Sequence, residues 1–192
     1  MRIIAATGNA HKLEEIYAII KNYDMDLVSQ KDAGFDIDVD ENGTSCEENS
    51  YIKAAAICKL SGQPCIADDT GLFVDAIDGE PGVNSARYSG VHGDDAANRA
   101  KLLEKLKGVP YEKRTASFVT VITLVYPDGK KLVARGECKG HIAEEERGDR
   151  GFGYDSLFIP EGCDKTFAQL SADFKNSISH RARALQRLEQ LL

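Results

Sequence analysis

The sequence lacks long hydrophobic runs, and no stretch approaches the roughly 18 consecutive apolar residues that a membrane-spanning helix needs. Residues 1–12 also lack the apolar core and the cleavage site of a signal peptide. We therefore expect a cytoplasmic protein with no membrane partner. The chain has 192 residues, 42% of them hydrophobic, which suits a single domain with a substantial core.

Cysteine pairs of the C-x-x-C type are absent as well. The five cysteines are an odd number, and no two of them are spaced as zinc ligands usually are. This pattern argues against a disulfide framework and against a zinc site, and favours free, buried thiols.

Basic residues are in the minority, because 24 Lys and Arg face 31 Asp and Glu and give a formal net charge of −7. Sequence-independent binding of nucleic acid needs many basic side chains on one face, so we expect no nucleic-acid partner. An anionic ligand would have to meet a local basic cluster or a metal ion.

Apolar periodicity predicts an α/β protein with a mixed sheet, since strands and helices alternate early and a hairpin follows late. A capping box formed by Thr44 and Glu47 is expected to open the second helix. Residues 79–93 and 148–153 are expected to be loops. Strands are expected at 3–6, 35–40, 65–67, 115–126, 131–138 and 157–159. Helices are expected after Asn9, from Thr44 towards Gly62, from Asp94 to Gly108, and at the C-terminus on Leu185, Leu188 and Leu192.

The segment between the first strand and the first helix can bind phosphate. It offers a glycine, polar side chains, free helix N–H groups and a lysine in the first turn. The alternative is an ordinary helix with Asn9 as its N-cap. The segment comprises Thr7, Gly8, Asn9, Ala10, His11 and Lys12.

Two adjacent carboxylates, Asp68 and Asp69, follow the second buried run, where they need positive charge nearby. Mg²⁺ takes one or two carboxylates plus phosphate oxygens, and Glu41 could supply the second. Strand alternation sends Asp68 and Asp69 to opposite faces, so we expect only one to point into the site. The alternative is a solvated turn, and the acids at 36, 38 and 40 are interpreted as a solvated face.

Two later segments could hold a nucleoside. Gly151-Phe152-Gly153-Tyr154-Asp155 places aromatic rings and a carboxylate in a glycine-flanked loop, which suits stacking on a base. The segment 174–181, at the expected start of the last helix, gathers Lys175, His180 and Arg181 as hydrogen-bond donors. The alternatives are a satellite core for the rings and an exposed basic helix face for the donors.

Five segments, taken in order, resemble one family closely. They read TGNxxK at 7–12, ADDTGL at 67–72, ARYSG at 86–90, GFGYD at 151–155 and SHRxxAL at 179–185. The chain is similar over nearly its whole length to the non-canonical purine nucleoside triphosphate pyrophosphatases, the inosine/xanthosine triphosphatase or Ham1-like family.

The resemblance implies Mg²⁺-dependent hydrolysis of ITP, dITP and XTP to the monophosphate and pyrophosphate. It also implies a homodimer of elongated α/β subunits, each a single two-lobed domain over residues 1–192 with a central active-site cleft. Asp69 matches the proton acceptor, and Glu41 and Asp69 match the metal ligands. Arg87 is a candidate only. Substrate contacts match Thr7 to Lys12, Lys53, Thr70, Phe152, Gly153, Tyr154, Asp155, Lys175, His180 and Arg181.

Our mechanistic hypothesis is that Mg²⁺ and Asp69 activate a water that attacks the α-phosphorus. Lys175, His180 and Arg181 would favour a 6-oxo purine, because the amino group of adenine leaves these donors unpaired. Two alternatives are a Mg²⁺-dependent phosphomonoesterase with Asp69 as nucleophile and a nucleotide-binding module without turnover.

Overall fold

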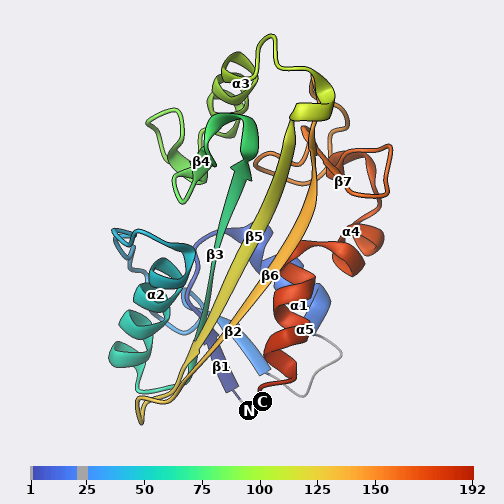
Figure 1. Cartoon of the computed structure of the whole chain (residues 1–192). Helices are drawn as coiled ribbons and strands as arrows, with labels where there is room; N and C mark the ends of the chain where they lie inside the picture. The colour runs from blue at the N-terminus through green and yellow to red at the C-terminus, as the bar shows by residue number, and fades with distance from the viewer. Residues whose placement is uncertain (1, 21–25) are drawn as a thin grey trace. The chain divides into compact units, whose positions relative to one another are not determined.

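The computed structural model describes residues 2–20 and 26–192 (Figure 1). The chain divides into two compact units. The first comprises the described residues up to Asp69, with Thr120–Gly136 and Arg181–Leu192, and the second comprises Thr70–Val119 and Glu137–His180. The single two-lobed domain over residues 1–192 stays a prediction.

The elements confirm an α/β protein with a mixed β-sheet. The sheet order is β2-β1-β3-β5-β6-β7, with β4 paired to β3. The strands are β1 (Arg2–Ala5), β2 (Asp26–Ser29), β3 (Cys65–Val74), β4 (Pro81–Gly82), β5 (Thr115–Val125), β6 (Lys131–Ile142) and β7 (Phe158–Pro160). The helices are α1 (Ala10–Ile20), α2 (Cys46–Ser61), α3 (Asp95–Lys105), α4 (Ala172–Ile178) and α5 (His180–Glu189).

In the first unit β1 pairs in parallel with β2 and with the start of β3. Successive side chains of β1 enter two different cores, because a strand alternates its side chains between its faces. Ile3 packs with residues of α1 and α5, whereas Ile4 packs with residues of α2. Helices therefore cover both faces of this part of the sheet (Figure 1), which explains why β1 is apolar from Ile3 to Ala5.

The second unit has its own core around an aromatic cluster. The ring centre of Phe158 lies 4.7 Å from the ring centre of Phe118 and 5.1 Å from that of Phe167. Strand β4 pairs antiparallel with β3, and β7 pairs antiparallel with β6. Residues 79–93 form the expected loop, apart from the two residues of β4 and one short 3₁₀ turn at Ser85–Arg87.

Helix α2 begins one residue later than the predicted capping box implies. Ser45 is the N-cap, and its hydroxyl accepts a hydrogen bond from the backbone N–H of Glu48 at 3.1 Å. The Glu48 carboxylate accepts in return from the backbone N–H of Thr44 at 2.6 Å. The prediction of Thr44 and Glu47 as the capping pair was therefore wrong by one position, although the helix ends at Gly62 as expected.

The strand predicted over 35–40 is absent, since residues 35–43 have no regular secondary structure. The Gln30 side chain donates to the carbonyl of Ile37 at 2.8 Å, so a side chain replaces a neighbouring strand as the backbone partner there. Strand β2, which sequence patterns did not predict, precedes this segment.

Two other boundaries differ from the prediction. Strand β3 continues through Asp68 and Asp69 to Val74 rather than ending at the acids. The C-terminal helical region is two helices, with Ser179 between α4 and α5, and Leu192 lies beyond α5 and is exposed.

The five cysteines are free, and four are buried, which confirms the expectation of buried thiols. Among residues 2–20 and 26–192, no helix combines the length and the apolar character needed to cross a bilayer.

Gly140 allows close packing of β6 against β7. A Cβ atom at Gly140 would lie 2.2 Å from the carbonyl oxygen of Ile159. We expect Gly140→Ala to lower the free energy of unfolding by about 2–3 kcal/mol, because a strand backbone must move to accept it. Urea denaturation measures this, with Gly8→Ala as control, since no atom lies within 4 Å of a Cβ at Gly8. Equal stability of the two variants would contradict the prediction.

Candidate active site

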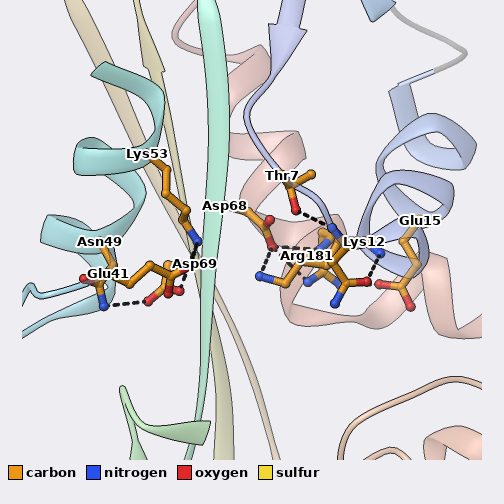
Figure 2. Close-up of polar contacts among 10 residues, drawn as sticks. Thr7, Lys12, Glu15, Glu41, Asn49, Lys53, Asp68, Asp69 and Arg181 are labelled. Carbon is orange, nitrogen blue, oxygen red and sulfur yellow. Dashed lines mark hydrogen bonds and ion pairs between the residues drawn. The ribbon is translucent and has the colours of Figure 1, made fainter. Parts of the chain in front are cut away.

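Strand β3 carries the two adjacent carboxylates, and each meets cations on a different face of the sheet (Figure 2). Asp68 contacts Lys12 of α1 and Arg181 of α5. Asp69 contacts Lys53 of α2. The predicted alternation is therefore confirmed, and the alternative of a solvated turn is wrong, since Asp68 is 1% and Asp69 5% exposed.

Asp68 joins two helices of the first unit. Its Oδ2 atom lies 2.9 Å from Arg181 Nη2 and 3.4 Å from Lys12 Nζ. Glu15 of α1 pairs with Arg181 Nη1, so the guanidinium lies between two carboxylates. Burial alone would raise the pKa of Asp68, but Lys12 and Arg181 hold that pKa well below its usual range.

Asp69 and Glu41 share one ammonium group. Lys53 Nζ donates to Glu41 Oε1 at 2.8 Å and to Asp69 Oδ1 at 3.4 Å. Burial would lower the pKa of Lys53, but Asp69, Asp68 and Glu41 together raise it, so this lysine stays charged. Burial raises the pKa of Asp69, against the opposing effects of Lys53 and Lys12. The buried thiol of Cys46 lies against Asp69 as a hydrogen-bonding neighbour.

The pair of Glu41 and Asp69 fits a hard divalent cation. Both offer carboxylate oxygens, and both already face a single positive charge on Lys53. In the described part of the chain, no group of three or more His, Cys, Asp or Glu could hold a metal ion. A cation at this pair would therefore take its remaining oxygens from water or from a bound ligand.

The segment Thr7 to Lys12 leads from β1 into α1. The Asn9 side chain accepts from the backbone N–H of Lys12 at 3.2 Å, and Thr7 Oγ1 accepts from the N–H of Asn9 at 3.2 Å. Asn9 is thus a helix N-cap, while phosphate binding by this segment stays a prediction. Gly8, Asn9, Ala10 and His11 are exposed, whereas burial lowers the pKa of Lys12. The segment therefore offers an accessible backbone at the helix N-terminus.

In the second unit, Lys175 of α4 pairs with Asp155 at 2.6 Å. Asp155 also accepts from the backbone N–H of Phe152 at 3.0 Å. The ammonium of Lys175 lies 5.2 Å from the centre of the Phe152 ring, within cation–π range. A Cβ atom at Gly151 would lie 2.1 Å from the Asp155 carboxylate, so glycine is needed there. These contacts fix a half-buried Phe152 beside a lysine.

Five other residues, four predicted to contact substrate and one a candidate, do not belong to this group of contacts around Phe152 and Lys175. Tyr154 belongs to the core of the second unit, and its hydroxyl donates to the Ser85 carbonyl at 2.7 Å. The imidazole of His180 stacks on Phe118 with ring centres 4.6 Å apart. Thr70 and Arg87 are half-buried. Arg181 pairs with Asp68 and Glu15 in the first unit.

Sequence reasoning missed several residues that hold the predicted ones. Asn49 contacts Asp69, and Glu15 contacts Arg181. On α3, Asp95 accepts from the backbone N–H of Gly153 at 2.8 Å, and Arg99 donates to the Gly153 carbonyl at 2.9 Å. Asp95 and Arg99 are four residues apart, and this spacing places them on one side of a helix. It does not indicate that they bind the loop at Gly153.

The chain is thus an α/β protein whose mixed sheet carries two buried carboxylates paired with lysines and an arginine. The chain belongs to the Ham1 family, whose model matches residues 3–191.

Three similar proteins illustrate the match. A dITP/XTP pyrophosphatase from Clostridium perfringens is 47% identical, over 100% of this chain and 97% of its own length. The structure of the Staphylococcus aureus Ham1 protein is 39% identical with a TM-score of 0.87, covering 100% of this chain and 97% of that one. A HAM1 protein structure from Coxiella burnetii is 36% identical with a TM-score of 0.89, covering 100% and 98%. These likenesses confirm the family that the sequence motifs resemble.

The ion pairs of Asp68 make stability depend on pH. Because its pKa is lower in the folded chain than the usual value of about 3.9, Asp68 stabilises the fold above that pH and loses this effect as the pH falls below it. We expect Asp68→Asn to lower the free energy of unfolding by about 3 kcal/mol at pH 7, since Lys12 and Arg181 lose a buried partner. The deficit should shrink between pH 4 and pH 3.

Urea denaturation with a chelator present, between pH 7 and pH 3, measures this deficit. The matched control is Asp36→Asn at an exposed position, which should change stability by less than about 0.5 kcal/mol. A deficit that stays constant down to pH 3 would contradict the assignment of these ion pairs.

Proposed function

We propose that this chain is a Mg²⁺-dependent pyrophosphatase that hydrolyses dITP, ITP and XTP to the monophosphate and pyrophosphate, and so removes deaminated purines from the nucleotide pool. The observation that carries the proposal is that Glu41 and Asp69, from separate segments, meet on the ammonium of Lys53. The printed name of the relative from Clostridium perfringens, dITP/XTP pyrophosphatase, supports the same activity.

The phosphate end of the substrate needs local positive charge, since the chain as a whole carries −7. We assign this role to Lys12, Lys53 and the N-terminus of α1, with Thr7 to His11 offering backbone N–H and polar groups and Thr70 a hydroxyl. Lys12 and Lys53 are held by Asp68 and Asp69, so the charges are in place before a ligand binds. Such preorganisation lowers the cost of binding.

Asp69 is the proposed proton acceptor. A carboxylate is a stronger base when burial raises its pKa, and Asp69 is shifted in this direction. Mg²⁺, when bound by Glu41 and Asp69, would supply positive charge against the phosphate oxygens. The Asp69 side chain would then take a proton from the attacking water, while Lys12 and Lys53 hold the phosphates in place.

The nucleoside end is assigned to the second unit. Phe152 offers a ring for stacking, and Asp155 holds Lys175 beside it. Gly153 and Tyr154 complete the loop, and His180 adds a ring N–H donor. Arg181 is proposed to take part in base recognition, with Asp68 and Glu15 fixing the orientation of its guanidinium. A 6-oxo group pairs with these donors, whereas the 6-amino group of adenine does not.

A homodimer and a cytoplasmic location complete the proposal, and the family resemblance supports both. A phosphomonoesterase would release free phosphate, and a nucleotide-binding module would release no product. The products of the reaction therefore decide among these functions.

Product analysis in ¹⁸O-water tests the reaction. With ITP and Mg²⁺ we expect pyrophosphate and labelled inosine monophosphate, because water attacks the α-phosphorus. In a panel of nucleoside triphosphates, we expect higher kcat/KM for ITP, dITP and XTP than for ATP and GTP. Label found only in pyrophosphate, release of free phosphate, or no turnover at all would refute the proposal.

Asp69→Asn should lower kcat by at least about 10²-fold, as loss of a general base does.

His180→Phe tests base recognition. Phenylalanine keeps an aromatic ring against Phe118 but removes both ring nitrogens, so the fold should persist. We expect the ratio of kcat/KM for ITP over ATP to fall about tenfold, since one buried donor contributes about 1–3 kcal/mol of discrimination. Lys12→Met is the control, and it should raise KM for both substrates alike. An unchanged ratio in the His180→Phe variant would exclude His180 from base selection.

A further inference from the structure

One face of α2 is directed at Asp69. Cys46, Asn49 and Lys53 are spaced three and four residues apart, which places them on the same side of a helix. All three are buried, and Asn49 is 0% exposed. Figure 2 shows Asn49, Lys53 and Glu41 gathered around Asp69. Asn49 lies between the segment that carries Glu41 and the strand that carries Asp69. Burial of its amide costs free energy unless the amide is hydrogen-bonded, so its partners indicate its role.

The contacts of Asn49 fix the direction of its amide. The backbone N–H of Gly43 donates to Asn49 Oδ1 at 2.8 Å, and an N–H group can only donate. The oxygen of the amide therefore faces Gly43, and the opposite end, the NH₂ group, faces Asp69. Asn49 Nδ2 donates to Asp69 Oδ2 at 3.4 Å.

The same amide holds the segment that carries Glu41. Gly43 lies two residues after Glu41, and a Cβ atom at Gly43 would lie 2.7 Å from Asn49 Oδ1. The backbone thus packs directly on the amide. Asn49 links two chain segments, one bearing Glu41 and one bearing Asp69, through a single rigid group.

The two oxygens of Asp69 have different partners. Oδ2 accepts from the neutral amide of Asn49, whereas Oδ1 faces Lys53, which also binds Glu41. A neutral amide does not repel a cation as an ammonium does, so Asn49 can orient the Asp69 carboxylate without opposing a divalent cation that Asp69 and Glu41 would hold. Hydrogen bonds from outside the ligand set orient metal-binding carboxylates in this way.

We propose that Asn49 is a positioning residue that sets the orientation of Asp69 and the place of Glu41 for a divalent cation. The proposal rests on the proposed function, since it takes Glu41 and Asp69 as the metal ligands. It adds a residue that neither the sequence motifs nor the family resemblance singled out.

Two variants separate the two hydrogen bonds. Asn49→Ala removes both of them. Asn49→Asp keeps an oxygen to accept from Gly43 but cannot donate to Asp69 and repels it. The matched control is Asn98→Ala on α3. Asn98 is also buried, and its side chain likewise accepts from a backbone N–H, that of Ser89 at 2.7 Å, in the second unit.

The first measurement is Mn²⁺ affinity by electron paramagnetic resonance, with an α,β-methylene analogue of ITP present and no turnover. We expect Asn49→Ala to weaken Mn²⁺ binding about 10–100-fold, the usual effect of losing a residue that orients a metal ligand. Asn98→Ala should leave Mn²⁺ affinity at the wild-type value even where it lowers the melting temperature. Unchanged Mn²⁺ affinity in Asn49→Ala, at a melting temperature lowered as in Asn98→Ala, would reduce Asn49 to a structural role and overturn the proposal.

The second measurement is kcat for ITP in Asn49→Asp. We expect kcat to fall at least about tenfold, measured at a temperature at which the variant is folded. Wild-type kcat in this variant would show that donation to Asp69 is not needed and would overturn the proposal even if Asn49→Ala fails to fold. Failure of the proposed function is distinguishable, because the wild-type protein itself would then bind no Mn²⁺ with the analogue or release no pyrophosphate.

Discussion

The burial of two adjacent carboxylates inside a strand is the constraint on which the site depends. Asp68 and Asp69 lie within β3, a strand of the central sheet, and neither is more than 5% exposed. A buried charge without a partner costs several kcal/mol, so each acid requires a cation on its own face of the sheet. Lys12 and Arg181 meet this need on one face, and Lys53 meets it on the other.

These requirements connect the layers of the first unit. Helices α1 and α5 share a core with one face of the sheet and bring Lys12 and Arg181 to Asp68, while Glu15 of α1 pairs with Arg181. Helix α2 packs on the other face and brings Lys53 and Asn49 to Asp69. Apolar packing thus sets the distance of each helix from the sheet. Charged side chains on the same helices then pair with Asp68 and Asp69. The candidate chemistry and the core share the same elements.

Local patterns predicted what local physics decides. Strand alternation placed Asp68 and Asp69 on opposite faces, and turn chemistry located the helix after Asn9. The alternation at 35–40 misled, because the Gln30 side chain occupies a backbone partner that a strand would have used. Glu15 was not predictable, since its partner Arg181 lies 166 residues away and no local pattern marks the pair. Asn49 was not predictable either, because its role follows from contacts with Gly43 and Asp69 that form only in the folded chain.

The shared ammonium of Lys53 has a consequence for the order in which ligands arrive. Lys53 already pairs with both acids and offsets one of their two negative charges, so a lone divalent ion would have to displace this ammonium from both partners. An ion that enters together with a triphosphate brings oxygens that can accept the displaced ammonium. Under the proposed function, this arrangement would favour entry of the metal together with the triphosphate over entry of a lone ion from solution.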